Sequence, residues 1–147
     1  MKNSLKDKLR SDLDDARRGR DRERTLVLST ALADVRNREI EAKALLDDEG
    51  VRGVLARAVK QRLDAAKQMR GGGRPELAER EEAQARILRA YLPAELSAGE
   101  VRGMVREIVA AGAGDIGAAM SALMPRIRGR FEGRAASAIV REELGGR

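Results

Sequence analysis

The sequence has no cysteine, no histidine and no tryptophan, and its 147 residues include one tyrosine and one phenylalanine, Tyr91 and Phe131. Without cysteine there is neither a disulfide nor a thiolate, and without histidine the commonest general base is missing. The usual zinc ligands are absent with them. Any chemistry would rest on carboxylates, lysine, one phenol and hydroxyl groups. We therefore expect neither a catalytic residue nor a cofactor, and no metal site.

Long apolar runs are also missing. No stretch of about 18 uncharged apolar residues is present, so we expect no transmembrane helix and no membrane partner. The segment Met1–Lys6 lacks the apolar run of a signal peptide. Together with the absence of cysteine, this favours a cytoplasmic protein. No segment alternates between apolar and polar residues with period two, so the sequence predicts an all-α fold without a sheet.

Arginine is abundant, and it dominates the charge. The chain carries 30 Lys and Arg against 24 Asp and Glu, a formal charge of +6. The planar guanidinium group suits phosphate recognition. Two segments concentrate arginine, Arg17–Arg24 and Arg126–Arg134. They are either sites for a polyanion or solvated helix surfaces, and charge alone leaves both interpretations open.

Pro93 marks the main division of the chain. Its ring cannot continue a helix, and Ser97 with Glu100 forms a capping box that starts another. We therefore predict an N-terminal helical domain over residues 1–92 and a small C-terminal three-helix bundle over residues 93–147.

The residues beside this division are apolar or aromatic. Tyr91, Leu92 and Leu96 flank the turn, and we expect them to join the two parts of the chain.

Apolar residues at helical spacing predict four helices in the first part. They run from Leu5 to about Ala16, from about Arg22 to Leu45 or Leu46, from Val51 to Gly71, and from Pro75 to Leu92. Asp21 and Asp47 are expected N-caps, and Pro75 suits the first position of a helix. Gly71–Gly73 ends the third helix, so the third and fourth should form a long antiparallel hairpin.

Further predictions concern which side chains of these helices are buried. Leu26 and Ile40 are expected to broaden the apolar face of the second helix, and Leu63 to continue that of the third. Asn37 is either buried, where it would fix the helix register, or solvated.

Three shorter helices are predicted in the second part. They cover Val101–Val109, Ile116–Leu123 and Ala136–Leu144, with Asp115 as the N-cap of the middle one. Pro125 should end that helix, or nearly so, and leave Arg126–Arg134 as a basic connector. Phe131 within it either stacks on a base or plugs the core, and we favour the core. Contact with folded RNA through shape and phosphates fits two aromatics better than base readout.

Several short segments resemble the GatB/YqeY family in their order and spacing, from Ser4 to about Leu144. They are Asp47-Asp48, Val59–Arg62, Leu77–Glu81, Tyr91-Leu92-Pro93, Leu96-Ser97, Met120, Leu123-Met124-Pro125, Gly129-Arg130 and Gly133-Arg134. The resemblance implies a C-terminal bundle similar to the tail of the B subunit of glutamine-dependent aminoacyl-tRNA amidotransferases. In that family the tail contacts tRNA while other regions do the chemistry. Free-standing relatives are grouped with carbon–nitrogen ligases that use glutamine as amido-N-donor.

We interpret the chain as a tRNA-binding or amidotransferase-associated accessory module that is not catalytic alone. The candidate phosphate-contacting residues are Arg126, Arg128, Arg130 and Arg134, with Lys60 and Arg62 in addition. The expected partners are tRNA and an aminoacyl-tRNA synthetase or amidotransferase. One alternative is a protein-interaction module that docks through the helical hairpin. Another is a non-autonomous component of a carbon–nitrogen ligase. The oligomeric state is left open.

Overall fold

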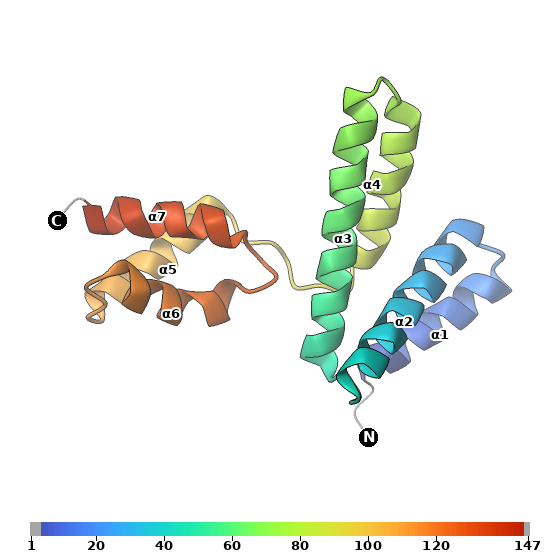
Figure 1. Cartoon of the computed structure of the whole chain (residues 1–147), viewed down its shortest axis with the longest axis horizontal. Helices are drawn as coiled ribbons and strands as arrows, with labels where there is room; N and C mark the ends of the chain where they lie inside the picture. Colours follow the sequence, from blue (N-terminus) through green and yellow to red (C-terminus); the bar gives the residue numbers. More distant parts are fainter. Residues whose placement is uncertain (1–3, 146–147) are drawn as a thin grey trace. The chain divides into compact units, whose positions relative to one another are not determined.

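The computed structural model describes residues 4–145, and within them the chain forms seven helices and no strand (Figure 1). In chain order they are α1 (Leu5–Arg18), α2 (Arg22–Ala42), α3 (Asp48–Gly71), α4 (Pro75–Arg89), α5 (Ala98–Ala110), α6 (Ile116–Ile127) and α7 (Gly133–Gly145). The all-α prediction is confirmed. The chain divides into two compact units, Met1–Leu92, here unit 1, and Pro93–Arg147, here unit 2. No helix in the described part of the chain is long and apolar enough to cross a membrane.

The starts of the helices follow from local sequence. The predicted N-caps at Asp21, Asp47, Ser97 and Asp115 each accept a hydrogen bond from a backbone amide of the first turn. Pro75 takes the first position of α4, as predicted. A side-chain cap stabilises a helix by about 1 kcal/mol, because it satisfies an amide that has no partner within the helix. These short-range predictions are confirmed.

Two predicted helix ends are wrong. We expected the second helix to reach Leu45 or Leu46, but α2 ends at Ala42 because Lys43 adopts a left-handed conformation with φ of 54°. We expected the fourth helix to reach Leu92, but α4 ends at Arg89. Pro125 ends α6 nearly as expected, since that helix continues only to Ile127. Proline in the last turn removes only its own amide from the helix ladder, so two more residues can follow. The basic connector is correspondingly shorter than predicted.

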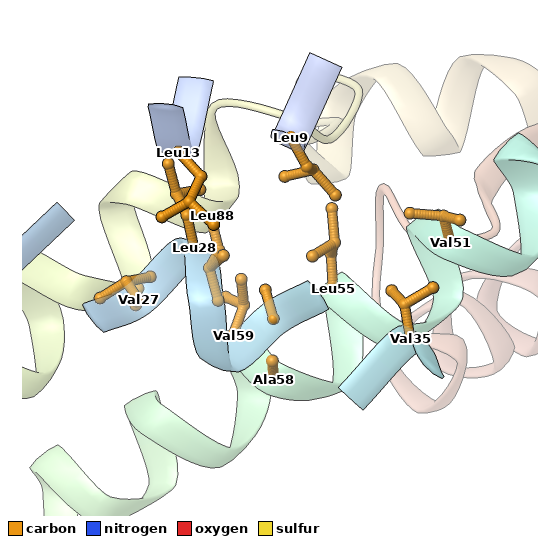
Figure 2. Close-up of a cluster of buried hydrophobic side chains, with 12 residues drawn as sticks. Leu9, Leu13, Val27, Leu28, Val35, Val51, Leu55, Ala58, Val59 and Leu88 are labelled. Carbon is orange, nitrogen blue, oxygen red and sulfur yellow. The ribbon is translucent and has the colours of Figure 1, made fainter. Parts of the chain in front are cut away.

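Unit 1 has an aliphatic core contributed by four helices (Figure 2). Its largest fully buried members include Leu9 of α1, Leu28 of α2, Leu55 of α3 and Leu88 of α4. Burying one such side chain stabilises the fold by about 1.5–3 kcal/mol. The core joins the N-terminal half of α3 and the C-terminal half of α4 to the α1–α2 pair.

The α3–α4 hairpin is antiparallel and extends beyond this core (Figure 1). In its outer part Ala66 and Ala78 are buried, while Leu63 remains 47% exposed. Leu63 therefore does not continue the buried stripe of α3 as expected, because α1 and α2 do not cover that part of the hairpin.

The predicted apolar face of α2 is narrower than expected. Leu26 is 54% exposed and Ile40 is 65% exposed, so neither broadens the buried face. Asn37 is exposed, so it is solvated and is not a buried amide that fixes the helix register.

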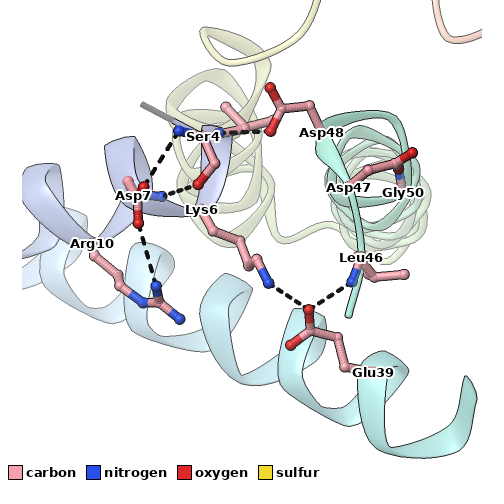
Figure 3. A network of polar contacts seen from close by, with 10 residues as sticks. Ser4, Lys6, Asp7, Arg10, Glu39, Leu46, Asp47, Asp48 and Gly50 are labelled. Atoms are coloured by element: carbon pink, nitrogen blue, oxygen red, sulfur yellow. Dashed lines mark hydrogen bonds and ion pairs between the residues drawn. The ribbon is translucent and has the colours of Figure 1, made fainter. Parts of the chain in front are cut away.

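Polar contacts hold the N-terminus of α1 against the start of α3 (Figure 3). The Asp48 carboxylate accepts a hydrogen bond from the Leu5 amide at 2.8 Å, while Asp47 caps α3 itself. Glu39 accepts from Lys6 Nζ at 2.6 Å and from the Leu46 amide at 2.7 Å. The hydrogen bond from Lys6, and then that from Leu46, lower the pKa of Glu39 below its usual value. Carboxylates thus fix the start of α1, the start of α3 and the loop that joins α2 to α3.

Unit 2 has its own aliphatic core between α5, α6 and α7. Its fully buried members include Val105, Leu123, Ile127 and Val140. Leu96 packs against this core from the segment before α5. Unit 2 is therefore closed by contacts among its own residues.

Tyr91 belongs to unit 1 and links three helices of that unit. Its hydroxyl donates to Asp12 Oδ2 of α1 and accepts from Arg24 Nη2 of α2 at 3.2 Å. The ring centroid lies 6.0 Å from Lys8 Nζ. We expected Tyr91, Leu92 and Leu96 to join the two parts of the chain.

In the structure Tyr91 and Leu92 pack against the core of unit 1, and Leu96 packs against that of unit 2. The contact between Tyr91 and Asp12 was not expected, because Asp12 lies far away in the sequence.

The ionisation of Tyr91 provides a test of this contact. Burial, and then the hydrogen bond to Asp12, raise the pKa of Tyr91 above its ordinary value. The unfolded chain releases this proton near pH about 10, whereas the folded chain retains it. The stability due to Tyr91 is therefore fully present below pH about 10 and is lost as the pH rises further.

We predict that Tyr91→Phe lowers the free energy of unfolding by about 1–3 kcal/mol at neutral pH, because Asp12 loses a donor. The difference from wild type should shrink above pH about 10. Denaturant titrations of both proteins at several pH values would measure this, and lysine ionisation cancels in the comparison. Since Tyr91 is the only tyrosine, phenolate absorbance reports it alone. A phenolate signal at pH about 10 with full helicity would contradict the prediction.

Candidate nucleic-acid interface

The backbone of unit 2 brings its predicted arginines to one end of the bundle. The Leu96 amide, just before α5, donates to the Arg130 carbonyl at 2.8 Å. The segment that enters unit 2 therefore lies against the loop between α6 and α7. That end carries four arginines, here called the basic end: Arg126, Arg128, Arg130 and Arg134. The prediction placed all four in a connector, but Arg126 lies in the last turn of α6 and Arg134 in the first turn of α7.

The four arginines differ in what their side chains contact. Arg126 Nη2 lies 3.3 Å from a carboxylate oxygen of Glu107, and both side chains are exposed. Exposed ion pairs of this kind are weak. Arg130 is half-buried, and its Nε donates to the Ala94 carbonyl at 3.1 Å. Arg128 and Arg134 are exposed. Arg130 is therefore held by the backbone, while Arg126, Arg128 and Arg134 are exposed to solvent.

The loop itself is shaped by Gly129, whose φ of +75° lies in the region that favours glycine. The amides of Arg130 and Phe131 both donate to the Ile127 carbonyl, at 2.8 and 3.1 Å. Phe131 is half-buried and packs against the core of unit 2. The structure thus places Phe131 as the core plug, the alternative that we favoured.

Lys60 and Arg62 lie on α3 and do not form one patch. Residues two positions apart point to different sides of a helix. Lys60 is exposed, whereas Arg62 is half-buried and donates from Nη1 to the Ala58 carbonyl at 3.3 Å. The Arg62 Nε is buried without a hydrogen bond. Of the two, Lys60 is the one that presents its charge to solvent.

A set of ion pairs in unit 2 was missed by the sequence analysis. Arg102 lies 2.8 Å from Glu143 and 2.6 Å from Glu142, and Arg106 lies 3.3 Å from Glu143. The hydrogen bond from Arg102, and then that from Arg106, lower the pKa of Glu143 below its usual value. The only signal in the sequence is Arg102 and Arg106 one turn apart on α5. These arginines are engaged with acids of α7.

The hollow between α2 and α3 of unit 1 has a volume of about 540 Å³. Both signs of charge line it, with Asp34 and Glu41 beside Arg38 and Arg57. In residues 4–145 no group of three or more acidic side chains is arranged to hold a metal ion. Of the predicted phosphate-contacting residues, those that the fold brings together are the four arginines of the basic end.

Comparison with known proteins places the chain in a family. Residues 6–144 match the Yqey-like protein family, YqeY. No curated protein matches the chain. The family match covers both units.

The contact between Arg130 and Ala94 can be tested directly. We predict that Arg130→Ala lowers the free energy of unfolding of unit 2 by about 0.5–1.5 kcal/mol, because the Ala94 carbonyl loses a donor. Hydrogen exchange at the Leu96 amide should become faster. Arg134→Ala removes the same charge from the same end and should change stability by less than about 0.5 kcal/mol. Equal effects of the two substitutions would show that Arg130 has no structural role.

Proposed function

The chain belongs to the YqeY-like protein family, and we propose that it is a tRNA-contacting accessory protein associated with aminoacyl-tRNA amidotransferase. On this proposal it has no catalytic residue of its own. The observation that carries the proposal is the basic end of unit 2, where four arginines gather with Glu132 as the one acidic residue in that stretch. Acidic and basic residues nearly balance over residues 93–147. The arginines are therefore concentrated locally.

The chemistry of this end favours phosphate contact. A guanidinium group donates two parallel hydrogen bonds to phosphate oxygens. Neither aromatic side chain is offered for base stacking, because Tyr91 packs in unit 1 and Phe131 packs in unit 2. Binding would then depend on the shape and charge of folded RNA, with little dependence on base identity.

The arginines of the basic end would have different roles. Arg128 and Arg134, whose side chains are exposed, would contact phosphates. Arg126 would exchange its exposed partner Glu107 for a phosphate, at little cost because that pair is weak. Arg130 would position the loop through Ala94. Lys60 and Arg62 of α3 are proposed as further contacts, with Lys60 the more accessible.

The salt dependence of tRNA binding tests this proposal. Replacing Arg128 and Arg134 together by Gln keeps polar side chains and removes two charges. We predict weaker binding of a tRNA transcript, with the slope of log K against log salt shallower by about 0.7–0.9 for each phosphate that the variant no longer binds. Filter binding or fluorescence anisotropy at several salt concentrations would measure both.

The matched control is Arg102→Gln with Arg106→Gln, which removes the same charge from unit 2. Because Glu142 and Glu143 already hold these arginines, this variant should retain the wild-type slope. Equally weakened binding by the two variants would show that only net charge matters. Wild-type binding by Arg128→Gln/Arg134→Gln would remove the basic end as the RNA site.

A second candidate function is protein docking through the α3–α4 hairpin. The outer part of the hairpin buries only Ala66 and Ala78 among its described apolar residues and leaves Leu63 47% exposed. Because this part of the hairpin buries little apolar surface within unit 1, Leu63 is accessible to a partner. The proposed partner is the amidotransferase or an aminoacyl-tRNA synthetase.

This candidate predicts binding that does not depend on RNA. The tagged protein should retain one of those enzymes from nuclease-treated lysate of its own cells, identified by mass spectrometry. Leu63→Glu should abolish retention, because a carboxylate cannot be buried there without a partner. Leu26→Glu, at a leucine 54% exposed on α2, should leave retention intact. Retention that disappears with nuclease treatment would contradict docking by protein contacts.

A further inference from the structure

The turn between α1 and α2 is short and is held by backbone hydrogen bonds. The Arg20 amide donates to the Arg17 carbonyl at 3.2 Å, and the Asp21 amide donates to the Ala16 carbonyl at 2.9 Å. The Asp21 side chain then caps α2 by accepting from the Arg24 amide at 3.1 Å. Side chains on this turn are consequently held on a well-ordered backbone.

Four arginines project from this turn, here called the turn arginines: Arg17, Arg18, Arg20 and Arg22, all of which are exposed. Arg17 and Arg18 lie near Asp14 and Asp15 of their own helix. Those exposed pairs are weak. Within residues 4–145, the side chains of Arg20 and Arg22 have neither an ion pair nor a hydrogen bond. Arg24 is separate, because it turns toward Tyr91.

Arg20 and Arg22 each occupy a position that disfavours them. Arg20 has a φ of 56°, in the left-handed region where glycine is preferred. The neighbouring Gly19 has an ordinary right-handed conformation, so the glycine is not at the position that needs one. Arg22 is the first residue of α2, where the helix dipole repels a positive charge. Neither arginine is thus explained by the stability of the turn.

Backbone strain alone does not identify a site, because Lys43 has nearly the same conformation, with φ of 54°. The surroundings of the two residues differ. Lys43 lies among acids, with Glu39 and Glu41 before it and Asp47 and Asp48 after it. Arg20 lies in the segment Arg17–Arg24, where five arginines outnumber the two acids Asp21 and Glu23, so positive charge is in excess there.

We propose that the turn arginines form a second phosphate-contacting site, which binds the same folded RNA as the basic end. The inference rests on the proposed function for the identity of the ligand. Arg20 and Arg22 would bind phosphate oxygens, and Arg17 and Arg18 would contribute once their local acids are displaced. Two sites on one chain raise the affinity for a ligand that reaches both, because the second contact becomes intramolecular.

The test uses substitutions that should change stability and binding in opposite directions. Arg20→Gly should raise the midpoint of thermal unfolding, because glycine adopts this conformation without strain. The same variant should bind a tRNA transcript about five- to eightfold more weakly at ~0.1 M salt, with a salt slope shallower by about 0.7–0.9. Arg22→Gln should show the same pair of effects, since it removes a positive charge from a helix N-terminus.

Lys43→Gly is the matched control. It removes one positive charge and relieves the same backbone conformation, so it should raise the unfolding midpoint and leave tRNA affinity and slope at wild-type values. If Arg20→Gly and Arg22→Gln both bind as wild type does, the turn site is overturned. If Lys43→Gly weakens binding as much as Arg20→Gly does, the proposal is overturned, because binding then depends on the net charge of the protein.

The two proposals fail in distinguishable ways. Unchanged binding by the turn variants, with weakened binding by Arg128→Gln/Arg134→Gln, removes the turn site and retains the basic end. The reverse pattern removes the basic end and retains the turn. A wild-type protein without salt-dependent binding of the tRNA transcript overturns both.

Discussion

Hydrogen bonds from helix-terminal amides to carboxylates are the interaction on which the rest of this structure depends. The core is built from leucine, valine, isoleucine and alanine, without a disulfide, so the ends of the helices need fixing by other means. Asp48 accepts from the first amide of α1 across 43 residues of sequence. Glu39 holds Lys6 and the Leu46 amide together (Figure 3). These bonds connect α1, α2 and α3 to one another, independently of the exposed arginines.

This use of carboxylates has a consequence for the arginines. Acidic side chains such as Asp21, Asp47 and Asp115 are directed to backbone amides at helix starts, and among the described residues none of these three forms an ion pair with an arginine. Positive charge is left exposed near helix ends, at the α1–α2 turn and at the α6–α7 loop. A formal charge of +6 is therefore a poor guide to local potential, which depends on which acids are engaged elsewhere.

The sequence predicts those parts of the structure that depend on neighbouring residues. The cap at Ser97 and the start at Pro75 are set within one turn of helix, and both were predicted correctly. The end of α2 was missed because Lys43 gives no sign of a left-handed conformation in the sequence. The exposure of Leu63 was missed because helical spacing identifies a face and not how far the neighbouring helices cover it.

In the candidate sites, too, contacts between residues far apart in the sequence could not be predicted. Tyr91 is fixed by Asp12, and Arg130 by the Ala94 carbonyl, and neither partner lies near in sequence. The sequence groups Arg130 with Arg128 because they are two residues apart. The fold fixes Arg130 in place, because its Nε donates to the Ala94 carbonyl.

The arginines of this chain therefore have different roles, which depend on what each side chain contacts. Arg24 and Arg130 hold structure, Arg102 and Arg106 bind acids of α7, and Arg20 and Arg22 have no side-chain partner among residues 4–145. Neutralising a whole basic segment would mix these roles, since weaker RNA binding could then follow from a loosened loop. Only substitutions chosen residue by residue, each compared with an arginine or lysine of known contacts, separate a phosphate contact from a structural one.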